Sequence, residues 1–288
     1  MWAIIGGSGF EKFDGFETVE ELYGETPFGM ASSGLKKVRV NGTEALFLSR
    51  HGAHHELTPS EVNYRANIFA LKYFGAKSIL SFSAVGSLRE ELAPGDLVIP
   101  NQYIDRTKGI REHTFSGDGI VGHVSLAKPV CLSAAEKTLA LLPEGRDWQG
   151  STGKTYICIE GPNFSTKAES HVYRQFGADI IGMTNFPEYA LAREAGMNYL
   201  PCCFVTDYDC WNEERPHVTL EEVIDVMRAN NAKAFALAQA VFAEDSSGIR
   251  YFQSGDEALE QGLRAGLMTP KEAISAEKME WLKVLLQD

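Results

Sequence analysis

Several features that define common classes of protein are missing from this chain of 288 residues. It has no uninterrupted run of about 18 apolar residues, so we expect no membrane-spanning helix. Its first residues lack a basic region followed by a long apolar one, so we expect no signal peptide. Lysine and arginine (27) are outnumbered by aspartate and glutamate (39), and the net charge of −12 argues against a protein that binds nucleic acid or a membrane surface.

Cysteine is also scarce, and its spacing does not suggest a disulfide framework. The five cysteines are an odd number and include no C-x-x-C pair, which favours buried thiols and a cytoplasmic location. His51, His54 and His55 have no carboxylate partners at the spacing of metal ligands, so we expect no metal site.

The two common nucleotide-binding fingerprints are absent as well. Residues 6–9 (Gly-Gly-Ser-Gly) follow an apolar segment but match neither G-x-G-x-x-G nor the loop that ends in G-K-[ST]. Glycines there allow backbone N–H groups to turn toward an anion, and Ser8 adds a hydroxyl donor. A plain tight turn explains these four residues equally well.

What is present is an alternation of strand-like and helix-like segments. We expect strands at residues 2–5, 45–48, 78–82, 96–100, 155–159, 180–184 and 201–206, and helices at residues 58–74, 166–176, 187–194 and 220–242. Capping-box patterns mark helix starts at Thr58, Ser133, Thr219 and Thr269. The alternation predicts an α/β fold with a central, largely parallel mixed sheet flanked by helices.

The end of the sequence differs in character. Residues 243–254 are polar and predict a linker, and helical patterns follow at residues 256–262 and 269–286. We therefore expect one main domain at residues 1–243 and a C-terminal helical extension at residues 244–288.

Small polar residues recur where predicted strands end. Ser8, Arg50, Ser83 and Thr184 each follow such a strand, with residues 83–87 expected to form a loop. Open α/β sheets place their sites at the carboxyl ends of strands. Several hydroxyl donors and one arginine suit an inorganic phosphate ion. Taken singly, each segment is explained as well by an ordinary turn.

The most informative segment is residues 202–211, where an apolar strand ends in two carboxylates. Asp207 and Asp209 are two positions apart, so in a strand both lie on the same side and can face one ligand. Carboxylates so close raise the proton affinity of one partner, which suits a group that donates a proton or a hydrogen bond. An acidic turn after a buried strand is the competing interpretation.

Taken in order, these segments resemble the 5′-methylthioadenosine phosphorylase family, within the superfamily of trimeric purine nucleoside phosphorylases. The resemblance covers residues 2 to about 242 and rests on residues 4–9, 49–52, 59–67, 84–88, 94–96, 104–107, 160–162, 164–169, 183–184, 187–188 and 206–211. It implies a nucleoside phosphorylase domain in which phosphate attacks the anomeric carbon of a purine nucleoside. It also implies a homotrimer with shared active sites, with inorganic phosphate as co-substrate and no cofactor.

The resemblance assigns roles to individual residues. It implies a phosphate site of Ser8, Arg50, His51, Ser83, Ala84 and Thr184. It implies a nucleoside site of Phe164, Ser165 and Met183, completed by His123 of a neighbouring subunit and by an apolar wall of Val218, Val223 and Ile224. Asp207 and Asp209 would bind the purine N7 and the 6-amino group, with Asp207 as the general acid.

Two residues depart from the family pattern, and three other functions stay open. Asn163 stands where the family usually has arginine, and Gly182 where it often has asparagine, so the choice of base could differ. The alternatives are an enzyme for 6-oxopurine nucleosides such as inosine or methylthioinosine, a nucleosidase that uses water, and a nucleoside-binding module without turnover. The aspartate pair favours a 6-amino base and Arg50 favours phosphate. We therefore expect phosphorolysis of S-methyl-5′-thioadenosine to adenine and 5-methylthioribose 1-phosphate.

Overall fold

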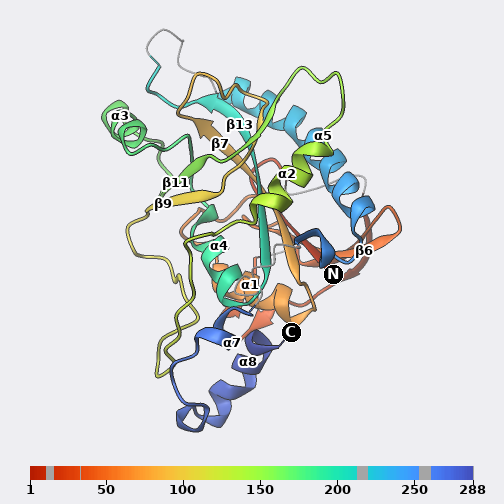
Figure 1. Cartoon of the computed structure of the whole chain (residues 1–288), viewed down its shortest axis with the longest axis vertical. Coiled ribbons are helices and arrows are strands. Elements are labelled where there is room, and N and C mark those ends of the chain that lie inside the picture. Colours follow the sequence, from red (N-terminus) through yellow and green to blue (C-terminus); the bar gives the residue numbers. More distant parts are fainter. Residues whose placement is uncertain (11–15, 33, 213–219, 253–260, 288) are drawn as a thin grey trace.

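The computed structural model describes residues 1–10, 16–32, 34–212, 220–252 and 261–287, and only the backbone of residues 220–223. The described part of the chain forms a mixed sheet of eleven strands. Figure 1 shows helices around this sheet. The sheet strands are β1 (Trp2–Gly6), β2 (Glu17–Glu21), β5 (Lys36–Val40), β6 (Thr43–Ser49), β7 (Ser78–Ser87), β8 (Leu97–Ile99), β9 (Gln102–Arg106), β10 (Gly150–Thr152), β11 (Thr155–Ile159), β12 (Ile180–Gly182) and β13 (Asn198–Tyr208). A separate hairpin joins β3 (Glu25–Thr26) and β4 (Gly29–Met30).

The helices alternate with these strands along the chain. They are α1 (Tyr64–Tyr73), α2 (Leu132–Ala140), α3 (Lys167–Gln175), α4 (Asn185–Glu194), α5 (Leu220–Glu244), α7 (Leu263–Gly266) and α8 (Ala276–Leu286), with short 3-10 helices η1 (Arg250–Phe252) and η2 (Lys271–Ala273). Within the described ranges no helix is long and apolar enough to cross a bilayer.

The centre of the sheet is parallel. β1 pairs with β6 on one side and with β7 on the other, and β7 continues to β13, all in parallel. Antiparallel pairs lie further out, where β5 meets β6 and β8 meets β13. The predicted α/β fold with a largely parallel mixed sheet is confirmed.

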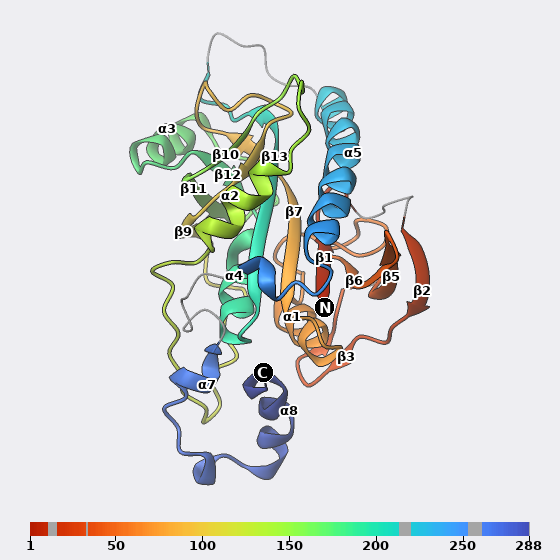
Figure 2. The ribbon, with the colours of Figure 1, turned by 45° about the vertical axis from the view of Figure 1, so that its right-hand side comes forward.

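Both faces of the central strands are buried. Side chains alternate along β1, so that Trp2 and Ile4 pack toward α5, and Ala3 and Ile5 toward α1 and α4. Figure 2 shows α5 running beside β7 and β1. Burial on two faces explains why these strands read as continuous apolar runs, and each fully buried large side chain contributes about 1.5–3 kcal/mol.

All seven expected strands are present with shifted ends, and the shift that matters most for the site is in β7, which continues beyond residue 82. Residues 83–87 are not a loop, because β7 extends to Ser87 and stays paired with β13 over its whole length. The ladder satisfies the backbone groups that a loop would expose.

Two helix starts differ from the sequence prediction. At Thr58 the capping-box side chain of Glu61 does accept hydrogen bonds from Thr58, but it closes a single turn. Helix α1 begins later, where the side chain of Asn63 caps it. Helix α2 begins after Cys131 with no side-chain cap, so the predicted box at Ser133 does not form.

The expected linker at residues 243–254 is ordered by packing where it is described. Its Tyr251 and Phe252 are buried, each with its ring 5.5 Å from that of Trp2. Trp2 in turn donates to the carbonyl oxygen of Asp245 at 2.7 Å. A polar composition did not predict this anchor, because two aromatic residues outweigh the polar residues around them.

The final helix is shorter than expected. Ser275, and not Thr269, caps α8, while the hydroxyl of Thr269 accepts from the backbone of Val121. Leu282 and Leu285 are buried in the cluster that contains α1. Residues 256–260 of the other expected tail helix lie outside the described residues.

Candidate functional site

Three chain segments meet at Gly7, beyond the carboxyl end of β1. The backbone N–H of Arg50 donates to Gly6 O at 2.8 Å, so the turns after β1 and β6 are joined. A Cβ at Gly7 would overlap Arg50 Nη1 and would lie 3.4 Å from the Cα of Ser83. Only glycine fits at this position, and Ser8 follows it directly. The sheet therefore brings together Ser8, Arg50 and Ser83 at one edge, as their places in the sequence predict.

Arg50 is a fully buried guanidinium in this cluster. Its Nε and Nη2 donate to the two carboxylate oxygens of Glu188 at 2.6 and 2.8 Å, and Nη2 also donates to Ser81 Oγ at 2.7 Å. Burial alone would lower the pKa of Arg50, but the carboxylate of Glu188 raises it above its ordinary value. The site therefore holds a permanent positive charge that is paired inside the protein.

Ser83 and Thr184 lie close together through Asn185. Asn185, the first residue of α4, donates from Nδ2 to Ser83 Oγ at 3.4 Å, and Ser83 donates to Cys203 Sγ at 3.3 Å. Thr184 is the N-cap of α4, and its side chain makes no cap hydrogen bond. Phe186 is not helical, so the regular turns of α4 begin after it, and Thr184 contributes a hydroxyl group next to the Asn185 that contacts Ser83. A hydroxyl donor at this place is favourable for an anion.

His51 and Ala84 complete the predicted anion site by their places in the chain. His51 is 3% exposed, and its Nδ1 is 2.8 Å from Leu57 O. Because a carbonyl oxygen only accepts, Nδ1 carries the proton of this bond. Ala84 pairs with Phe204 across β7 and β13, one position after Ser83.

Asp207 and Asp209 lie on the same side of the chain, as their spacing predicts. A bulge in β13 between Val205 and Asp207 shifts the register so that Asp207 faces Gly86 of β7. A Cβ at Gly86 would lie 3.3 Å from Asp207 Oδ1 and 3.6 Å from the Cβ of Asp209. The two aspartate side chains therefore lie beside the same residue of β7, and glycine at position 86 leaves room for them.

Both carboxyl groups hold their protons more strongly than an exposed aspartate. Burial raises the pKa of Asp207; the hydroxyl of Thr206, which donates to Oδ2 at 2.7 Å, offsets part of this, and the charge of Asp209 adds to it. Burial likewise raises the pKa of Asp209, and the nearby Ser170 lowers it in part. In the described structure Asp209 Oδ2 and Ser170 Oγ are nevertheless both buried without a hydrogen-bond partner. Asp209 Oδ2 is therefore open to a polar group of a ligand.

The predicted base-binding loop lies next to this pair. Cys210, which follows Asp209, donates from Sγ to Ser165 O at 3.2 Å. Phe164 is 81% exposed, so a planar ligand can reach its ring. Met183 packs against Gly161, where any Cβ would overlap its sulfur atom. Ser165 therefore contacts the residue that follows Asp209, and Met183 packs against the hydrophobic cluster that contains Trp211.

Other predicted residues are not brought to this place within one chain. His123 is exposed, and its backbone N–H donates to Gly266 O of the tail. Ile224 is 38% exposed on the first turns of α5. Val218 and the side chain of Val223 lie outside the described residues. In the described ranges no group of three or more His, Cys, Asp or Glu side chains is placed to hold a metal ion.

Sequence reasoning missed the buried charges that support the site. Arg111 is 5% exposed and donates to Glu160 Oε1 at 2.7 Å, to Met183 O at 2.7 Å and to Phe186 O at 2.8 Å. It thus ties the turn around Thr184 to the Glu160 loop. Glu188 and Glu160 both stand in segments of the family resemblance, but their partners are distant in sequence and no local pattern identifies them.

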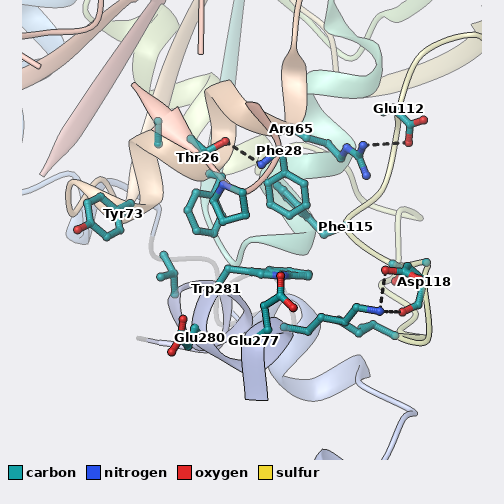
Figure 3. Close-up of a pocket in the computed structure, with 18 of the residues that line it drawn as sticks. Thr26, Phe28, Arg65, Tyr73, Glu112, Phe115, Asp118, Glu277, Glu280 and Trp281 are labelled. Carbon is teal, nitrogen blue, oxygen red and sulfur yellow. Dashed lines mark hydrogen bonds and ion pairs between the residues drawn. The ribbon is translucent and has the colours of Figure 1, made fainter. Parts of the chain in front are cut away.

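A large cavity lies elsewhere, at the end of the molecule where α8 packs. Its volume is about 930 Å³. Figure 3 shows Phe28, Phe115 and Trp281 around it, together with Arg65 and Glu112. None of the predicted site residues that the structure describes lines it. The chemistry of the strand ends therefore outweighs cavity size in locating the functional site.

Known proteins similar to this chain identify its family. A model of the phosphorylase superfamily matches residues 2–243. The S-methyl-5′-thioadenosine phosphorylase of Geobacter sulfurreducens is 42% identical over 98% of this chain and 96% of its own length, and that of Rhodospirillum rubrum is 48% identical over 84% and 81%.

Solved structures give the same result. A methylthioadenosine phosphorylase from an antarctic soil metagenomic library is 44% identical, with a TM-score of 0.84 over 99% of this chain and 98% of its own. Methylthioadenosine phosphorylase from Schistosoma mansoni in complex with adenine is 33% identical, with a TM-score of 0.78 over 92% and 99%. The chain therefore belongs to the phosphorylase superfamily and, within it, to the 5′-methylthioadenosine phosphorylase family.

Proposed function

We propose that the protein catalyses the phosphorolysis of S-methyl-5′-thioadenosine to adenine and 5-methylthioribose 1-phosphate. It is a pentosyltransferase of the purine nucleoside phosphorylase type, as its relatives indicate. The observation that favours a 6-amino purine is the pair Asp207 and Asp209, whose side chains both lie beside Gly86 and whose pKa values are raised by burial. A protonated carboxyl group can donate to N7, and a carboxylate can accept from the 6-amino group.

In the proposed reaction the phosphate ion lies between the Gly7–Ser8 turn, Arg50, His51, residues 83–84 and Thr184. Backbone N–H groups, hydroxyl groups and a fixed positive charge are all donors to a phosphate oxygen. A phosphate oxygen attacks C1′ of the ribose, and the bond from C1′ to N9 of the base breaks. The oxocarbenium character that develops on the sugar is stabilised by the adjacent anion.

Asp207 assists the leaving group in this proposal. Adenine leaves poorly as an anion, so a proton at N7 lowers the barrier to its departure. The raised pKa of Asp207 fits this role, because the group retains a proton to a higher pH than an exposed aspartate does. Asp209 accepts from the 6-amino group, Phe164 and Ser165 contact the base, and Met183 contacts the ribose.

The remaining roles require a neighbouring subunit. We propose a cytoplasmic homotrimer in which His123 of one subunit completes the 5′ end of the next subunit's site, beside the apolar residues Val218, Val223 and Ile224. The exposure of His123 within one chain supports this arrangement. Inorganic phosphate is the co-substrate, and the mechanism needs neither a cofactor nor a metal ion.

The test is release of the free base from methylthioadenosine, adenosine, methylthioinosine and inosine, each with and without phosphate. The proposal expects phosphate-dependent release of adenine that is fastest with methylthioadenosine. Faster reaction of the inosine compounds would assign the enzyme to 6-oxopurines. Equal release without phosphate would make it a nucleosidase, and no release from any substrate would leave a binding module.

A further inference from the structure

Glu188 lies beneath the proposed phosphate site without being part of it. It is 1% exposed, on α4, and each of its carboxylate oxygens accepts a hydrogen bond from the fully buried Arg50. Oε1 accepts two more, from Ser81 Oγ at 2.7 Å and from Tyr199 OH at 2.8 Å. A carboxylate that accepts four hydrogen bonds is held in one place, and it holds the guanidinium group of Arg50 in one place as well.

Hydrogen bonds inside the protein use most of the N–H groups of Arg50. Of its five N–H groups, the one on Nε and both on Nη2 are used by Glu188 and Ser81, and Nη1 donates one to Phe82 O at 3.2 Å. Among the described contacts, the remaining N–H belongs to Nη1. Nη1 is also the atom that lies against Gly7. Arg50 therefore presents a single N–H group, on Nη1, to the glycine turn. It does not present two parallel N–H groups.

Loss of the bonds to Glu188 would change the orientation of this N–H group. Without the carboxylate, Nε and Nη2 would lose their acceptors in a buried place, and a buried charge without its partner rearranges or draws in water. The guanidinium group of Arg50 would then adopt a different orientation. A phosphate ion would meet a guanidinium that is no longer held in position.

We propose that Glu188 is a positioning residue for phosphate, which fixes the orientation of Arg50 so that Nη1 faces the Gly7–Ser8 turn. The inference rests on the proposed function, because it takes Arg50 as a phosphate ligand. It predicts that Glu188 acts on the affinity for phosphate and not on the affinity for the nucleoside.

The test compares Glu188→Gln with wild-type enzyme under steady-state conditions. An amide keeps the shape of the side chain but places a donor opposite an arginine N–H, so the KM for phosphate should rise at least tenfold while the KM for methylthioadenosine changes less than threefold. Ser81→Ala and Tyr199→Phe each remove one donor from Glu188 Oε1 and should give smaller increases in the same parameter. These two variants keep the test available if Glu188→Gln does not fold.

Glu194→Gln is the matched control. Glu194 is a second buried acid on α4, 8% exposed, and it accepts hydrogen bonds from Thr114 Oγ1 and the Phe115 N–H, both at 2.6 Å. Its loss should lower stability without moving the KM for phosphate by more than twofold. If both variants raise this KM equally, the effect is a general loosening of α4 and the proposal is wrong.

A double-mutant cycle separates positioning from an independent role. If Glu188 acts through Arg50, the variants Glu188→Gln and Arg50→Lys should be strongly non-additive in kcat/KM for phosphate. Phosphate should also raise the melting temperature of wild type more than that of Glu188→Gln. Additive effects, or an unchanged KM for phosphate in folded Glu188→Gln, would overturn the proposal. Absence of phosphate-dependent turnover in the wild type would instead remove the proposed function itself.

Discussion

The phenolic oxygen of Tyr156 occupies the space that a side chain at Gly182 would need. A Cβ at Gly182 would overlap the phenolic oxygen of Tyr156, which is fully buried. That oxygen accepts a hydrogen bond from the backbone N–H of Thr184 at 3.5 Å. Glycine in place of the family's frequent asparagine therefore makes room for a tyrosine, which holds the turn that carries Thr184. The departure seen in the sequence is compensated by a residue on the neighbouring strand.

This relationship predicts the effect of Tyr156→Phe. The loss of one buried hydrogen bond of modest geometry should weaken the position of Thr184 by about 0.5–1.5 kcal/mol, so the KM for phosphate should rise roughly 2- to 10-fold. Steady-state kinetics with varied phosphate measure it. Tyr103→Phe is the control, because the Tyr103 hydroxyl is buried without a partner in the described structure. An equal change in both variants would contradict a specific role for the Tyr156 hydroxyl.

Asp207→Ala tests the general acid. The variant removes the proton donor proposed for N7, so kcat with methylthioadenosine should fall by about 10²- to 10⁴-fold. A nucleoside that is methylated at N7 already carries a positive base and should lose much less. Circular dichroism checks that the fold is kept. Near-normal turnover of methylthioadenosine by a folded variant would remove Asp207 from the acid role.

The pH dependence of stability tests the burial of Asp209. Its pKa is raised in the folded protein, so the folded state binds the proton more tightly than the unfolded state does. Stability from this group is therefore present below the ordinary value of 3.8 and is lost as the pH rises through the folded pKa. Each tenfold difference in proton affinity between the folded and unfolded states corresponds to about 1.4 kcal/mol.

Asp209→Asn should therefore raise the melting temperature at pH 7 and have little effect near pH 4. The amide is uncharged, and it can donate to Ser170 Oγ, which is otherwise buried without a partner in the described residues. Thermal unfolding at several pH values in low phosphate measures the difference. Asp105→Asn, at an exposed position, is the control. A lower melting temperature at pH 7 would show that the charge of Asp209 is favourable in the fold.

The sequence predicted those parts of the site that depend on local order. The strands and the same-side arrangement of Asp207 and Asp209 follow from the two-residue period of a strand, and both are observed. The convergence of Ser8, Arg50 and Ser83 follows from the parallel order of β1, β6 and β7. The first feature is set by the local period of a strand, and the second by the general rule that an alternating α/β sequence forms a parallel sheet.

The parts that escaped prediction depend on partners that are distant along the chain. Glu188 meets Arg50 across 138 positions, and Arg111 meets Glu160 across 49, so neither pair leaves a local pattern. The extension of β7 through residues 83–87 was missed because small residues resemble a loop until the pairing with β13 is known. Tertiary pairing decided each of these cases.

The packing of Trp281, in the C-terminal helix α8, should contribute to the stability of the fold. Trp281 of α8 meets Phe28 edge to face at 5.0 Å, and Arg65 of α1 lies 5.1 Å from the same Phe28 ring (Figure 3). A fully buried tryptophan loses about 3–5 kcal/mol on truncation to alanine, and a half-buried one should lose less. Trp281→Ala should therefore lower the free energy of unfolding by about 1–3 kcal/mol.

Urea unfolding measures that loss, with the exposed Lys283→Ala on the same helix as the control, expected within about 0.5 kcal/mol of wild type. Because the cavity beside Trp281 contains none of the described site residues, kcat and both KM values of Trp281→Ala should equal those of wild type well below its melting temperature. A raised KM for methylthioadenosine in a fully folded variant would mean that the tail shapes a nucleoside site. A raised KM for phosphate alone would instead connect α8, through α1, to the strand ends around Arg50.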